Sequence, residues 1–318
     1  MQSTASALLN RLLARGKFRH VQVLLLLAEL GSVQRPADAI GMTQSSITQT
    51  LAYLEELLEA RLFERHARGV RPTPACMDLL PVARQLMQGI ANSAEVITAR
   101  QNEGEGVARI FGSAAAIHGL LLKALPAFSD RHPGIQVHLG EAEGEDQLLT
   151  IARGEVDFAV CRRPAVIPEG WEFHPLVQDQ FAIVCRADHR LARARSPTWA
   201  NLAQETWLLL PAGVAARRVF DGLSTKFPHP PKTYPVVTRA IALVWWLLRE
   251  RELLALLPLN LVRPLIDSGA LTQLRIGDAV RIEPIGLLQP QAGMGSAAAR
   301  LSDFLRQYVA PGTKPARK

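Results

Sequence analysis

The stretch ADAIGMTQSSITQTLAYLE, residues 37–55, decides how the rest of the chain is interpreted. Thr43 stands where an N-cap belongs, and Gly41 gives the preceding turn backbone freedom, so we expect a helix to begin near Gln44. Apolar residues then recur every three or four positions, which predicts a helix with one buried face. These residues are Ile47, Leu51, Leu54 and Leu58.

The other face of this helix carries small polar side chains that can approach the edges of DNA bases. Serine, threonine and glutamine donate and accept hydrogen bonds, and nothing bulky blocks the approach. The candidate DNA-binding residues are Thr43, Gln44, Ser45, Ser46, Thr48 and Gln49. A surface helix of an unrelated bundle has a similar composition, so this stretch alone leaves both interpretations open.

A basic segment, LFERHARGVRPT at residues 62–73, follows the helix and predicts a hairpin wing around Gly69. Arginine in such a wing can bind phosphates or lie in the narrow minor groove beside the helix. The candidate residues are Arg65, Arg68 and Arg71. A solvated charge cluster is the usual alternative for a basic run taken singly.

From about Lys17 to Thr73 the chain resembles the winged helix-turn-helix of LysR-type transcriptional regulators in the order and spacing of its parts. The resemblance implies sequence-specific binding to double-stranded operator DNA, a small organic effector, and RNA polymerase as a further partner. Pro36 departs from the usual alanine and predicts a distorted start to the second helix. Ser45, Gln49 and Cys76 also depart, and the first two leave phosphate anchoring to the wing.

The bulk composition is that of a globular protein with more than one domain. The 318 residues are 48% hydrophobic and 20% charged, and the net charge of +7 favours a polyanionic partner. The richest apolar run, IALVWWLL, ends at once in RERE, so no membrane span is expected. Residues 1–16 are interpreted as a short leader rather than an export signal, which predicts a cytoplasmic protein.

A long helix is expected to begin at Thr73, an N-cap followed by Pro74. Pro81 should bend it near Met77. A narrow apolar seam favours a partner helix over packing on the helix's own domain, and the resemblance implies a dimer or tetramer. The seam residues are Leu80, Ala83, Met87, Ile90, Ala94 and Ile97.

Beyond residues 101–108 strands and helices alternate, which predicts an α/β domain with a parallel sheet. Later strands are expected at 178–189, 206–211 and 233–238. The resemblance implies a two-lobed effector-binding domain similar to periplasmic solute-binding proteins. The predicted domains are 1–73 (winged helix-turn-helix with leader), 74–103 (linker helix) and 104–318 (effector-binding), with lobe one at about 107–177 and 286–310 and lobe two at about 178–285.

Ligands of open α/β sheets bind where strands end and helices begin. By resemblance, the effector-binding residues are Ser113, Ala114, Cys161, Arg162, Pro211, Gly213, Thr238 and Arg239. Arg162 and Arg239 predict an anionic effector such as a carboxylate, although ordinary surface arginines explain them nearly as well. Ser113 and Thr238 are equally explained as helix caps.

Two other classes of protein were weighed against a regulator. A solute-binding protein, or a small-molecule-binding protein with a degenerate DNA-binding domain, would keep the cleft and lose the DNA affinity. An enzyme would need a nucleophile with its base, a metal cluster or a phosphate loop, and none is found, so no cofactor is expected. Cys76, Cys161 and Cys185 show no metal spacing and are expected to be buried thiols rather than a redox pair.

Overall fold

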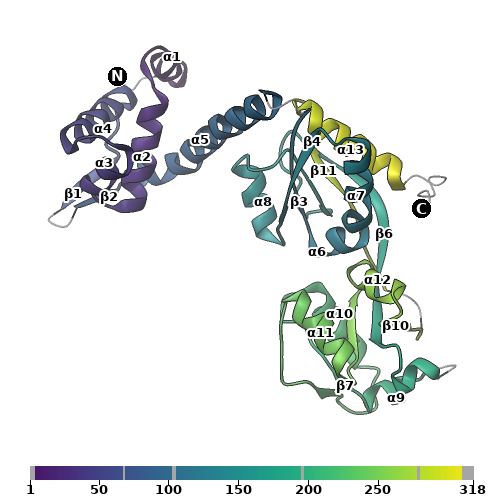
Figure 1. Ribbon diagram of the computed structural model, residues 1–318. Coiled ribbons are helices and arrows are strands. Elements are labelled where there is room, and N and C mark those ends of the chain that lie inside the picture. Colours follow the sequence, from purple (N-terminus) through teal and green to yellow (C-terminus); the bar gives the residue numbers. More distant parts are fainter. Residues whose placement is uncertain (1–3, 67–68, 102–104, 195–196, 278–279, 310–318) are drawn as a thin grey trace. The chain divides into compact units, whose positions relative to one another are not determined.

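The computed structural model describes residues 4–66, 69–101, 105–194, 197–277 and 280–309. The chain forms two compact units, one of residues 1–102 with 149–155 and one of residues 103–148 with 156–318. The first unit has the helices α1 (Ala5–Arg15), α2 (Phe18–Leu30), α3 (Gln34–Ile40), α4 (Gln44–Leu58) and α5 (Pro74–Gln101), and the strands β1 (Phe63–His66) and β2 (Gly69–Pro72) (Figure 1).

The expected recognition helix is α4, and its start at Gln44 is confirmed. The Thr43 hydroxyl accepts a hydrogen bond from the backbone N–H of Ser46 at 3.2 Å, as an N-cap does. Leu57 is fully buried, and Leu58 is only partly buried. At 3.6 residues per turn Leu58 lies on the same side as Ile47, Leu51 and Leu54, and it packs against the core that they form, whereas Leu57 is buried outside that cluster.

Pro36 does not break the second helix. Because α3 begins at Gln34, Pro36 is its third residue, where a backbone N–H has no intrahelical acceptor in any case. The expected leader also has structure: it forms α1, whose Arg11 Nη1 lies 2.5 Å from Glu59 Oε1 beyond the end of α4. Residues 5–15 are therefore part of the N-terminal unit.

The wing is an antiparallel hairpin in which Phe63 pairs with Pro72 and His66 with Gly69. Gly69 has φ +142°, and a Cβ added there would lie 2.1 Å from the Gly31 carbonyl oxygen. The same oxygen accepts a hydrogen bond from the Val70 N–H at 3.0 Å. Only glycine permits this approach, so the wing is fixed against the end of α2.

The linker helix begins as expected, since the Thr73 hydroxyl accepts a hydrogen bond from the Cys76 N–H at 3.2 Å. Two residues assigned to the dimer seam are placed differently. Leu80 is 5% exposed and Ala83 is 3% exposed, and both belong to the hydrophobic core of the N-terminal unit. Their assignment to a partner helix is wrong, because the first turns of α5 cover their own domain.

The second unit is the expected α/β domain. Its elements in lobe one are β3 (Gly106–Gly112), α6 (Ala114–Ala116), the π-helix η1 (Ile117–Leu121), α7 (Leu122–Arg131), β4 (Ile135–Glu141), β5 (Phe158–Arg162) and α13 (Ser296–Val309). The helix α8 (Glu145–Ala152) begins in this unit, and its residues 149–152 belong to the first unit. Those in lobe two are the 3-10 turn η2 (Arg190–Arg193), α9 (Trp199–Ala203), β7 (Thr206–Trp207), α10 (Ala215–Ser224), β8 (Lys232–Thr233), α11 (Ile241–Glu250), β9 (Ala255–Pro258), α12 (Leu259–Asp267) and β10 (Leu271–Leu274).

Two long strands, β6 (Trp171–Arg186) and β11 (Arg281–Pro290), pass between the lobes. The seven-stranded sheet has the order β10-β6-β11-β5-β3-β4, with β9 also on β6. The strands β3, β4 and β5 are parallel, but β11 is antiparallel to β5 and β6, and β9 and β10 are antiparallel to β6. The expectation of a parallel sheet is thus corrected to a mixed one, because the chain enters lobe two on β6 and returns on β11.

Two expected strands of lobe two are much shorter than predicted. Strand β7 ends at Trp207, and β8 ends at Thr233 rather than continuing to residue 238. Pro211 and Pro235 lie in the remaining parts of these stretches and cannot donate to a β-ladder.

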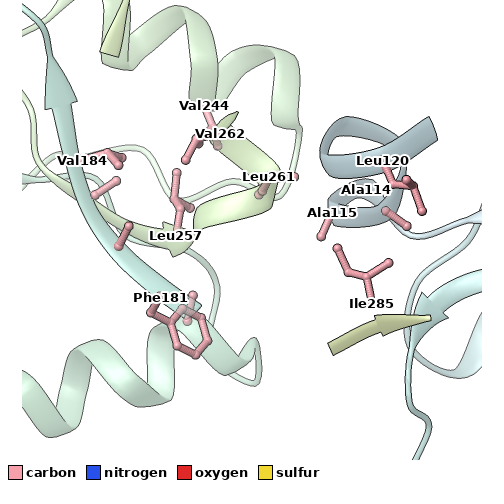
Figure 2. Packing of buried hydrophobic residues seen from close by; sticks show 14 of the residues in the cluster. Ala114, Ala115, Leu120, Phe181, Val184, Val244, Leu257, Leu261, Val262 and Ile285 are labelled. Atoms are coloured by element: carbon pink, nitrogen blue, oxygen red, sulfur yellow. The ribbon is translucent and has the colours of Figure 1, made fainter. Parts of the chain in front are cut away.

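One hydrophobic cluster runs through both lobes. In Figure 2, Ile285 of β11 points toward Ala115 of α6, while Phe181 and Val184 of β6 lie with Leu257 on the other side. Leu261 of α12 lies on the side nearest α6. The lobes therefore share a core around the crossing strands.

We predict that Gly69→Ala destabilises the N-terminal domain by about 2–3 kcal/mol, since the added Cβ would overlap the Gly31 carbonyl. Gly41→Ala is the matched control: its φ is +65° and nothing lies within 4 Å of its Cβ, so only the left-handed backbone costs about 1 kcal/mol. Amide hydrogen exchange over residues 18–72 measures both. Equal losses of protection would contradict the close approach.

Candidate DNA-binding surface and effector site

The polar face of α4 is exposed along its first turns. Gln44, Ser45 and Gln49 are exposed, whereas Ser46 and Thr48 are partly buried. The Thr43 hydroxyl lies 2.8 Å from the hydroxyls of both Ser45 and Ser46, so these three side chains hold the helix start together. The glutamines are left as the longest polar side chains that project from this surface.

The wing places two of its three candidate arginines on the surface. Arg65 and Arg71 are exposed, and Arg68 lies outside the described residues. In the register of the hairpin, Arg71 is directly opposite Glu64, whose charge reduces the positive field at that position. Arg35, exposed in the first turn of α3, is a further cation on this domain that the sequence analysis did not single out.

The junction between the lobes is organised by Asp179, whose side chain is fully buried. One of its oxygens lies 2.5 Å from Arg162 Nη2, at the end of β5. The other accepts backbone N–H hydrogen bonds from Gln180 at 2.9 Å and from Asn260, in α12, at 3.1 Å. Arg162 also donates to the Glu283 carbonyl at 2.6 Å. The guanidinium of Arg162 is thus held by the chain itself, and its expected role as an effector ligand stays a prediction.

The start of α6 carries a second internal carboxylate. The Ala114 N–H donates to Glu143 Oε1 at 2.7 Å, and the Ser113 hydroxyl caps the helix by accepting from the Ala116 N–H at 3.3 Å. Burial raises the pKa of Glu143, the Ala114 hydrogen bond lowers it, and Arg239 is among the nearby charges that also lower it. The backbone donor expected to meet an anionic effector is thus already satisfied.

Two aromatic side chains meet across the junction. The ring centroids of His118, in η1, and Trp245, in α11, lie 4.5 Å apart at an interplanar angle of 56°. His118 Nδ1 and Trp245 Nε1 are buried and have no hydrogen-bond partner among the described residues. Burial lowers the pKa of His118, opposed by the charge of Glu141. A π-helical turn such as η1 is frequently found at functional sites.

The remaining expected effector residues lie in loops of lobe two that precede helices. Thr238 lies before α11 and accepts a hydrogen bond from the Ala240 N–H at 3.0 Å, but the N-cap of α11 is Ala240 itself, while Arg239 is exposed. Gly213, exposed with φ +91°, lies in the loop after Pro211 that leads to α10.

The expectation that the cysteines are buried thiols is confirmed. Cys161 and Cys185 are both fully buried, and burial raises the pKa of each thiol to about 12. Cys76 is likewise buried, with its pKa raised to about 11. Reactivity requires the thiolate, so this environment opposes a redox role.

Comparison with known proteins agrees with this arrangement. A family model described as the bacterial regulatory helix-turn-helix protein, lysR family, matches residues 18–77. A second, described as the LysR substrate binding domain, matches residues 101–310. The chain belongs to the LysR family of transcriptional regulators. As a LysR-type regulator it combines a DNA-binding domain with an effector-binding domain.

Similar proteins span most of this LysR-type chain. The transcriptional regulator GbpR of Azospirillum brasilense is 26% identical over 298 residues, which cover 90% of this chain and 86% of that protein. The regulator GalR of Pseudomonas putida is 27% identical over 296 residues, or 92% and 74% of the two chains. The structure of full-length CbnR with its target DNA has a TM-score of 0.65 at 20% identity, covers 92% of this chain and 99% of CbnR, and shares its fold.

Two other properties of this LysR-type regulator are read from the described residues alone. No helix there is both long enough and apolar enough to cross a bilayer. The same residues contain no group of three His, Cys, Asp or Glu side chains that could hold a metal ion.

The sequence did not indicate that four side chains lie at the lobe junction. These are Glu143, Asp179, His118 and Trp245. A signal for Asp179 does exist, since it is an acidic residue at the start of an apolar strand that crosses between lobes. Trp245 lies in the apolar run IALVWWLL, which does not by itself indicate a ligand site. Its contact with His118 joins residues over a hundred positions apart, which no local pattern reveals.

We predict that Asp179→Asn lowers the free energy of unfolding of the effector-binding domain by about 3 kcal/mol, because a half-buried Arg162 loses its counter-charge. Asp267→Asn is the control: its partner Lys123 is 64% exposed, so the loss should stay below about 1 kcal/mol. Denaturation followed by tryptophan fluorescence reports on this domain, since all five tryptophans lie in it. A smaller loss for Asp179→Asn than for Asp267→Asn would refute the assignment.

Proposed function

We propose that this protein is a cytoplasmic regulator whose binding to promoter DNA responds to a small organic effector held at the lobe junction. The α4 helix reads base edges in the major groove with Gln44, Ser45, Thr48 and Gln49. The wing contacts phosphates or the minor groove through Arg65 and Arg71. RNA polymerase is the proposed further partner at the promoter.

The proposed homodimer uses the exposed side of α5. Val82 is 51% exposed, Leu86 is 54% exposed and Ile97 is 58% exposed, and Ile90 lies between them at helical spacing. Large apolar side chains so exposed along one helix favour a partner helix. Met87, Ile90, Ala94 and Ile97 stay in the proposed seam, while Val82 and Leu86 replace the buried Leu80 and Ala83. Pairs of such dimers would form the tetramer.

The single observation that carries the effector proposal is the pair of unpartnered ring nitrogens at the junction. Buried polar atoms are almost always hydrogen-bonded, and an indole N–H is a donor only. An effector oxygen that accepts from Trp245 Nε1 and bonds His118 Nδ1 would satisfy both. The effector would then touch η1 of lobe one and α11 of lobe two, so its binding free energy depends on how the lobes are arranged.

An anionic group on the effector is proposed to pair with Arg239 rather than with Arg162. Arg162 is held by Asp179, and the backbone at α6 is held by Glu143. The Glu143 carboxylate would repel an anion when ionised, so protonation of this group should favour binding. Because burial raises its pKa, that protonation occurs at a higher pH than for an exposed glutamate.

Coupling to DNA follows from the two strands that cross the junction. An effector that favours one arrangement of the lobes shifts the population of that arrangement by its differential affinity. In a dimer, the shifted packing of subunits changes the spacing or angle of two paired recognition helices on a pseudo-palindromic operator.

A nuclease footprint on the DNA upstream of this protein's own gene tests DNA reading. We expect Arg65→Ala and Arg71→Ala to weaken binding to all DNA sequences. Each should also reduce by about one the steepness with which the logarithm of the binding constant falls against the logarithm of the salt concentration. Gln49→Ala should relax specificity and leave the slope unchanged. Arg249→Ala, in lobe two, is the control. Salt-sensitive binding without sequence preference would favour a small-molecule-binding protein with a degenerate DNA-binding domain.

Calorimetry with a panel of small organic acids tests the effector site. We expect Arg239→Ala to weaken binding of the active acid about tenfold or more, since a charge-assisted pair is lost. Glu143→Gln should bind at least as tightly as wild type and should lose the strengthening of binding as pH falls. Binding unchanged in Arg239→Ala, with Trp245→Phe also unchanged, would exclude this site.

A further inference from the structure

Lobe two contains a cavity of about 550 Å³ that the proposed function does not use. Its floor is the face of the sheet formed by β6 and β9, and its sides are α9, the end of α10 and residues 274–277 and 280. Small-molecule sites in proteins have volumes of roughly 300–1,000 Å³. The space is therefore sufficient for an organic ligand of moderate size.

The lining of this lobe-two cavity combines an apolar floor with polar residues around it. Phe181, Ile183 and Leu256 line the floor and are each 6% exposed. Trp199 forms one side, and its ring packs on Phe227 with centroids 5.8 Å apart, which fixes its position. Leu223 of α10 lines the cavity beside it. A flat or branched hydrocarbon body could bury its surface here.

The rim of the cavity is positive. Lys226 and Arg275 both line it and are exposed. Lys226 Nζ lies 5.2 Å from the centre of the Trp199 ring, so the cation is held over the mouth by the indole. Among the described residues, no carboxylate lines the cavity and neither cation forms an ion pair. Gln180 and Gln273 add amide groups to the lining.

We propose that this cavity is a second ligand site, separate from the lobe junction, for an amphipathic organic anion. The ligand has an aromatic or branched aliphatic body that packs on Phe181 and Ile183, and one acidic group that pairs with Lys226 and Arg275. The apolar floor excludes a highly charged metabolite, and the two cations select against a neutral or cationic compound.

The position of the cavity connects it to the crossing strands. The Phe181 N–H donates to the Val280 carbonyl at 2.8 Å, and Gln180 is opposite Arg281 in the register of β6 and β11. Asp179, which organises the lobe junction, immediately precedes these lining residues. A ligand packed on Phe181 thus stabilises the segment at which the chain enters and leaves lobe two, and it can bias the arrangement of the lobes.

Titration of the full-length protein with 8-anilinonaphthalene-1-sulfonate tests the proposal, with the uncharged N-phenyl-1-naphthylamine as the matched probe. We expect one saturable sulfonate site by fluorescence and calorimetry. The double variant Lys226→Gln, Arg275→Gln should weaken it roughly fivefold or more, since each rim pair contributes modestly in solvent. Leu223→Trp, which fills the cavity without a change of charge, should abolish it.

The control is Lys232→Gln, Arg249→Gln, which removes two exposed cations of lobe two that do not line the cavity. It should leave sulfonate binding unchanged. Equal affinity for both probes, or equal binding in the two double variants, would overturn the proposal. Loss of the sulfonate site in Arg239→Ala alone would also overturn it, because the probe would then occupy the lobe junction. The footprints and the organic-acid calorimetry of the proposed function use neither naphthalene probe, so the two proposals fail or stand on separate measurements.

Discussion

The buried carboxylate of Asp179 is the constraint around which the effector-binding domain is arranged. It pairs with the guanidinium of Arg162 at the end of β5, and it accepts the backbone N–H of Asn260 in the first turn of α12. It lies in β6, where that strand passes from lobe one to lobe two. Taking such a charge out of water is costly unless every lone pair is used. Its partners are therefore held in one geometry, and the two lobes share a defined point of contact rather than a loose connection.

Close backbone approach adds a second constraint at the same junction. A Cβ on Gly119 of η1 would lie 2.6 Å from the Cβ of Asn260, the residue whose N–H reaches Asp179. Asn260 is itself 2% exposed and donates to the Gln178 carbonyl at 3.0 Å. The π-helical turn and α12 are thus in direct contact. A ligand bonded to the ring nitrogens of His118 and Trp245 would lie beside this tightly packed contact, so small displacements at the ligand would move both elements.

Local patterns predicted the parts of the fold that local forces decide. Thr43 and Thr73 mark helix starts because a hydroxyl at that position meets the backbone a few residues later. Arg162 was assigned to an effector by resemblance and by its place at the end of a strand, and nothing near it in sequence indicates its ion pair with Asp179. Leu80 and Ala83 were misassigned for a related reason: a stripe at spacing three and four fits a domain core and a partner helix equally well. Pairing over long sequence distances is what the sequence of one chain does not reveal.

The burial of Leu80 and Ala83 has a mechanical consequence. The first turns of α5 pack into the same hydrophobic core as α2, α3 and α4, so α5 acts as a lever arm whose base is fixed to the DNA-binding domain. Rotation of the far end of α5 would therefore also move Gln44 and Gln49 on α4. Adjustment of the DNA-reading surface would then depend on the twist and bend of a single 28-residue helix. Pro81 lies between Leu80 and Ala83, so the backbone hydrogen bond that it removes falls within the buried base of α5 rather than along its exposed part.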